Sequence, residues 1–105
     1  MNQEVRSIME QFFAMLYKAN IACMSLISGN NGEGVISVIG NGGTIRSSLK
    51  NCFDHVRQGD ANEGQEAIVD IILDVISLSY SPHDLFQIMD ERTNILLRHG
   101  KVADA

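Results

Sequence analysis

The sequence has few of the features that mark a membrane or secreted protein. Its longest nearly apolar stretch, residues 67–78, is interrupted by Asp70 and Asp74. This stretch is also shorter than the roughly 20 residues that a membrane helix needs. The first residues include Glu4 and Arg6, where a secretory signal would need an uninterrupted apolar segment. We therefore expect a cytoplasmic location and no insertion into a membrane.

Cysteine and histidine are scarce, which argues against disulfide and metal chemistry. Cys23 and Cys52 both fall at apolar positions of their elements, so free thiols in the core are favoured over a disulfide or a reactive thiolate. His55, His83 and His99 fall on separate predicted helices, and none has the spacing of a zinc ligand pair. The sequence predicts no metal and no cofactor.

Basic residues are outnumbered, with eight Lys and Arg against thirteen Asp and Glu, for a net charge of −5. This balance argues against a dedicated nucleic-acid binder, because such proteins cluster cations along one face. Between residues 60 and 91 there is no Lys or Arg, whereas Arg46, Lys50 and Arg57 make the preceding segment locally basic. A nucleic-acid role through that segment is therefore a minor alternative.

The composition is that of a chain that folds, with 45% hydrophobic and 20% charged residues. At 105 residues it has the size of one domain, so we expect a single α+β domain over residues 1–105, with 101–105 as a loose tail. Apolar residues recur every three or four positions over residues 3–19. That spacing predicts the first helix.

Residues 21–28 and 34–39 are short apolar runs that flank the turn-forming segment 29–33, and this pattern predicts an antiparallel β-hairpin. Alternation places apolar side chains on both faces of each run, and two strands alone are marginal in water. Helices of the same chain can cover one face, so we expect a second copy to complete the sheet. The first guess is a dimer that shares four strands. The candidate interface residues are Met24, Leu26, Val35, Ile36, Val38 and Ile39.

Three further helices follow the hairpin, which gives the order α-β-β-α-α-α with the hairpin packed on helices. Thr44 is the expected N-cap of the first, and Gly59 its end. Asn62 caps the second, which reaches about Ser79 and is so apolar that we expect it to be the most buried helix. The last begins with Ser81 as N-cap followed by Pro82, and it ends at Gly100.

The glycine-rich turn over residues 40–44 is the main candidate for a small-ligand site. Backbone N–H groups at the start of a helix can bind a phosphate or carboxylate, and nearby side chains can add donors. The candidate residues are Gly42, Gly43, Thr44, Arg46 and Ser47. The segment matches neither the P-loop nor the dinucleotide-binding pattern, so an ordinary tight connection is the favoured interpretation.

No set of nucleophile, base and metal ligand converges in the sequence. Asp70 and Asp74 lie one helical turn apart, a spacing that suits a divalent cation or an acid–base pair, but a polar strip is the favoured interpretation. His55 beside Asp54 is a weak pair, because adjacent helical residues point in different directions. We therefore expect a non-enzymatic, homo-oligomeric accessory or interaction protein, with a possible protein partner. The alternative function is a binder of a small anion or nucleotide at the glycine-rich turn.

Overall fold

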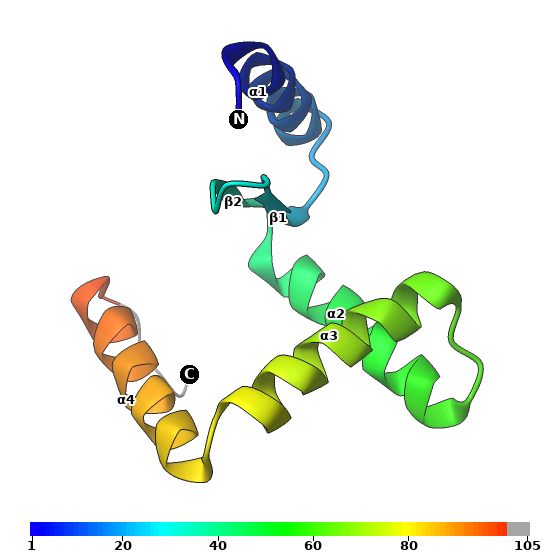
Figure 1. The fold of residues 1–105 in the computed structure, drawn as a ribbon, viewed down its shortest axis with the longest axis vertical. Coiled ribbons are helices and arrows are strands. Elements are labelled where there is room, and N and C mark those ends of the chain that lie inside the picture. Colours follow the sequence, from blue (N-terminus) through cyan, green and yellow to red (C-terminus); the bar gives the residue numbers. More distant parts are fainter. Residues whose placement is uncertain (101–105) are drawn as a thin grey trace.

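The computed structural model describes residues 1–100 and has the predicted element order, with four helices and one antiparallel hairpin (Figure 1). The predicted loose tail, 101–105, lies outside the described residues. The elements are α1 (Gln3–Lys18), β1 (Cys23–Ser28), β2 (Gly34–Ile39), α2 (Gly42–Gln58), α3 (Glu63–Ser79) and α4 (Pro82–Arg98).

Side-chain caps define where three of the helices begin. Asn2 caps α1 by accepting a hydrogen bond from the backbone N–H of Val5. Asn62 and Gln65 form a reciprocal capping box at the start of α3, as their spacing predicted. Ser81 and Asp84 form the second box, at the start of α4. These caps satisfy N–H groups that have no partner within the helix.

The N-cap of α2 is Asn41, so the prediction of Thr44 was wrong. The Asn41 side chain accepts a hydrogen bond of 2.7 Å from the N–H of Gly43. The helix begins three residues earlier than predicted, because Gly40, at φ +82°, already turns the chain at the end of β2. A Cβ at Gly40 would lie 2.9 Å from the Cα of Ala22, so this close approach requires glycine.

The hairpin has one half-buried face and one largely exposed face, on which Met24 also lines a pocket with Ile45 and Leu49 of α2. In its register Met24 lies opposite Val38, and Leu26 lies opposite Ile36. Burial alternates along both strands, and the half-buried side chains belong to the other set, which includes Ile27. Helix α1 packs against β2, as Figure 1 shows. One helix of the same chain therefore covers one face of the ribbon.

Helices α2 and α3 pack against each other, and Val69 lies in their contact. It is 3% exposed and is the one buried side chain among residues 1–100. The rest of α3 does not match the expected buried helix, since Ile71 and Leu78 are 63% and 81% exposed. Helix α4 has no extensive contact with another element within residues 1–100 (Figure 1).

The described chain is much more open than a folded monomer of its size. Its radius of gyration is 16.5 Å, whereas a compact domain of this length has about 13 Å. It exposes 8512 Å² of surface, whereas a compact monomer of 11.6 kDa exposes about 5,800 Å². The excess is more than about 2,000 Å², and much of it is apolar.

Candidate interaction surface

The open face of the hairpin is formed by four large apolar side chains. Two cross-strand pairs build it, Met24 with Val38 and Leu26 with Ile36. Their exposed fractions lie between 52% and 77%. Because directly opposed residues on one face lie about 5 Å apart, the four side chains form one continuous patch. We call these four residues the hairpin face.

The six predicted interface residues divide between the two faces. Met24, Leu26, Ile36 and Val38 form the hairpin face, whereas Val35 and Ile39 lie half-buried on the side of α1. On that side Ser25 lies opposite Ser37, and the Ser25 hydroxyl is buried without a hydrogen-bond partner in residues 1–100. The α1 side is thus less apolar in its middle than the hairpin face.

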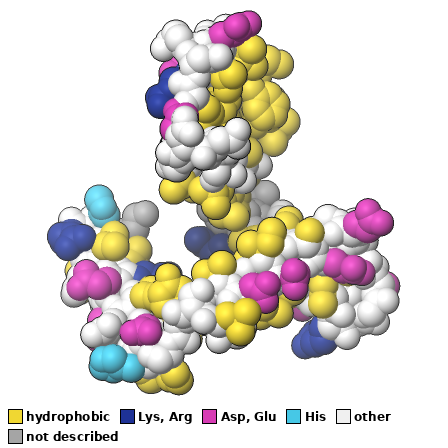
Figure 2. Space-filling view, in the orientation of Figure 1, with side chains coloured by type: hydrophobic (Ala, Val, Ile, Leu, Met, Phe, Trp, Pro, Cys, Tyr) yellow, Lys and Arg dark blue, Asp and Glu magenta, His cyan; other side chains and the backbone are white. Residues whose placement is uncertain are grey.

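Apolar side chains are also exposed on the helices. Helix α1 exposes Ile8 and Met15, and α4 exposes Phe86 and Met89. Figure 2 shows apolar surface over several elements of the visible side of the molecule. Large exposed apolar patches are rare on monomeric proteins and are typical of interaction sites.

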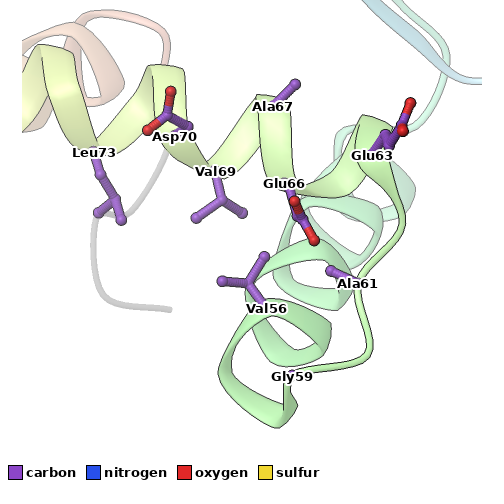
Figure 3. A pocket seen from close by; sticks show the side chains of 9 residues that line it. All are labelled: Val56, Gly59, Ala61, Glu63, Glu66, Ala67, Val69, Asp70 and Leu73. Atoms are coloured by element: carbon purple, nitrogen blue, oxygen red, sulfur yellow. The ribbon is translucent and has the colours of Figure 1, made fainter.

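A groove between α2 and α3 has an apolar floor and an acidic border, and sequence reasoning did not predict it. Its volume is about 640 Å³, and Val56, Val69 and Leu73 contribute to its apolar lining. Glu66 extends from α3 toward Ala61 and Val56, whereas the Asp70 carboxylate, one turn later on the border, is directed away from them (Figure 3). The sequence signal was the acidic strip of α3 beside apolar residues, but it does not reveal that α2 forms the opposite wall.

Asp70 and Asp74 do not form a metal site with other residues that the structure describes. No group of three His, Cys, Asp or Glu side chains within residues 1–100 converges to hold an ion. Asp70 instead borders the α2/α3 groove. A row of acidic side chains is visible along α3 in Figure 2.

At the glycine-rich turn, caps already occupy several of the donors that an anion would need. The N–H of Gly43 donates to the Asn41 side chain, and the N–H groups of Thr44 and Ile45 donate to the Asn41 carbonyl. The Arg46 guanidinium lies back near Gly42, 3.4 Å from where a Cβ would stand. Gly42, Gly43, Thr44, Arg46 and Ser47 are thus together in the first turns of α2. An anion site there remains a prediction.

The remaining polar candidates form local surface pairs. His55 Nδ1 lies 2.8 Å from a carboxylate oxygen of Asp60, in the turn after α2, rather than pairing with Asp54. A hydrogen bond from the Lys50 ammonium, at 2.8 Å, lowers the pKa of Asp54 below its ordinary value. Cys23 and Cys52 are half-buried free thiols.

Comparison with known proteins finds no protein-family model, curated protein sequence or solved structure that matches this chain. Within residues 1–100, no helix is long and apolar enough to cross a membrane. The hairpin face is the most distinctive surface feature of the described residues.

Proposed function

We propose that this protein is a non-enzymatic interaction protein that works as a homo-oligomer, with a dimer as its smallest assembly. The observation that supports the proposal is the hairpin face, where Leu26 and Ile36 oppose each other and are 73% and 77% exposed. Fully burying one such side chain contributes about 1.5–3 kcal/mol. An uncovered face of four therefore favours association strongly.

The amount of excess surface favours a permanent partner over a transient one. A standard interface removes about 800 Å² from each partner. The excess of more than about 2,000 Å² per chain falls in the range of obligate assemblies, whose interfaces resemble a domain core cut in half. Folding and assembly of this chain are then one process.

A second copy suits the hairpin face better than an unrelated protein. The face carries no charge, and a two-fold axis through it would place Leu26 and Ile36 of one copy against the same pair of the other. The two strands also have outer edges without a neighbouring strand in the described chain. Edge pairing between copies would extend the sheet to four strands and satisfy those backbone groups.

Native mass spectrometry of the purified full chain, with light scattering over a dilution series, tests the proposal. We expect a mass that is a multiple of 11.6 kDa and a melting temperature that falls on dilution. A folded 11.6 kDa monomer at micromolar concentration, with a melting temperature independent of concentration, would overturn it.

A further inference from the structure

Helix α4 is directed away from the rest of the chain by the residues that join it to α3. Tyr80 and Ser81 are both extended, with φ/ψ of −130°/135° and −78°/164°. Pro82 restricts Ser81 to this region, because its ring disfavours the helical conformation in the preceding residue. The chain therefore does not reverse tightly after α3, and α4 diverges from it (Figure 1).

One face of α4 combines apolar residues with a single cation. Arg92 has Ile88 and Leu96 one turn before and after it, with Met89 and Ile95 at the i−3 and i+3 positions. These spacings place all five residues on one side of the helix. No carboxylate within residues 1–100 forms an ion pair with Arg92. Covering this face without an acidic partner for Arg92 would be costly, because a buried charge must be paired.

The α2/α3 groove has the complementary chemistry. Its floor is apolar, and Glu66 and Asp70 lie along its border at an i, i+4 spacing. Like charges at this spacing repel, and no cation within residues 1–100 forms an ion pair with either. A helix that brings apolar side chains and one guanidinium would fill the floor and relieve the repulsion.

We propose that two copies exchange α4, so that the α4 of each copy lies in the α2/α3 groove of the other, with Arg92 against Glu66 and Asp70. The inference deepens the proposed homo-oligomer and rests on it. Each copy has one α4, which we call the arm, and one α2/α3 groove. Reciprocal docking therefore gives a closed dimer in which neither the arm nor the groove is left exposed.

The connection between α3 and α4 supports exchange over folding back within one chain. In an antiparallel helix pair joined at Tyr80 and Ser81, Arg92 would come level with about residue 69, beside Asp70. The same contact therefore exists in principle within one chain. The two extended residues before Pro82 oppose that reversal, and short, restricted connections of this kind favour exchange of an element between copies.

Charge reversal on the two sides of the contact tests the proposal. The groove variant carries Glu66→Lys and Asp70→Lys, and the arm variant carries Arg92→Glu. In each variant alone, both copies of the contact bring like charges together, and we expect association to weaken by roughly 100-fold or more. When the two variants are co-expressed with different tags, both contacts are again between opposite charges. We therefore expect mixed assemblies in native mass spectrometry.

A control matched to the groove variant makes the same change in net charge elsewhere. Glu10→Lys on α1 with Asp90→Lys on α4 alters two acidic residues that border neither the groove nor the Arg92 face. We expect this control to assemble like the unsubstituted chain. Circular dichroism of every variant monitors folding, and co-expression keeps the test decisive even where a single variant does not fold alone.

The other outcomes separate this proposal from the proposed function. Single variants that assemble like the unsubstituted chain would overturn the exchange and leave the homo-oligomer intact. A triple variant combines Glu66→Lys, Asp70→Lys and Arg92→Glu in one chain. If association recovered in this triple variant but not in the co-expressed mixture, the contact would lie within a single chain, which would overturn the exchange. A loss of association that neither the triple variant nor co-expression recovers would also overturn the exchange. A monomeric unsubstituted chain would overturn the homo-oligomer and the exchange together.

Discussion

Leu26 on β1 and Ile36 on β2 face each other across the hairpin, on the side that α1 leaves open. Both side chains are largely exposed, at 73% for Leu26 and 77% for Ile36. In an isolated chain this pair would remain in water, and two strands by themselves are only marginally stable. The pair therefore provides the most direct experimental access to the proposed assembly.

Replacing both residues, Leu26→Thr with Ile36→Thr, should weaken self-association. Threonine retains the β-branched preference for strands, so the hairpin itself should persist. The lost apolar burial should raise the dissociation constant more than roughly 100-fold, which light scattering on dilution would measure. Tyr17→Thr on α1 is the control, because it removes an equally exposed large side chain that does not belong to the hairpin face. An unchanged dissociation constant in the double variant would contradict the assignment of the hairpin face.

Val69→Ala should destabilise the contact between α2 and α3. Val69 is the one buried side chain within residues 1–100, so its truncation removes packed methyl groups and costs about 1–2 kcal/mol of unfolding free energy. Val75→Ala makes the same chemical change on the same helix at a 49% exposed position and should cost much less. Urea unfolding at one fixed, low protein concentration compares the two. Equal losses would mean that assembly buries Val75 as well.

Asn41→Ala should destabilise the start of α2, whereas Thr44→Ala should have little effect. The Asn41 side chain accepts the hydrogen bond from Gly43, and loss of such a cap costs about 1 kcal/mol. Thr44 lies within the helix, where alanine is at least as favourable. Thermal unfolding followed by circular dichroism distinguishes them, and a larger loss for Thr44→Ala would restore that residue as the cap.

The Lys50–Asp54 pair should contribute a small, pH-dependent stabilisation of α2. The lowered pKa of Asp54 means that the folded chain holds its carboxylate ionised more strongly than the unfolded chain does. The contribution is therefore present above about pH 4 and is lost as the pH falls through the lowered pKa. Asp54→Asn should reduce the melting temperature slightly near pH 7 and have progressively less effect as the pH falls through the lowered pKa. Added salt should reduce the difference, because the pair is exposed.

Local chemistry allowed most of the fold to be predicted from the sequence. Asn62 with Gln65 and Ser81 with Pro82 mark the starts of α3 and α4, because capping depends on residues only three positions apart. The alternation within residues 23–28 and 34–39 likewise determined the hairpin and its two sets of side chains. The cap at Asn41 was missed because Gly40 turns the chain against Ala22, a contact between distant positions.

The tertiary structure alone decided which apolar faces meet and which remain open. Periodicity shows that the stripes of α1, α3 and α4 are apolar, but it does not identify the surface that covers each stripe. Connections and chain direction decide that α1 covers the side of Val35 and Ile39 and that α2 packs on Val69. They also decide that α4 has no extensive contact within residues 1–100. Burial is a property of pairs of surfaces, so the candidate site emerged only once those pairs were in place.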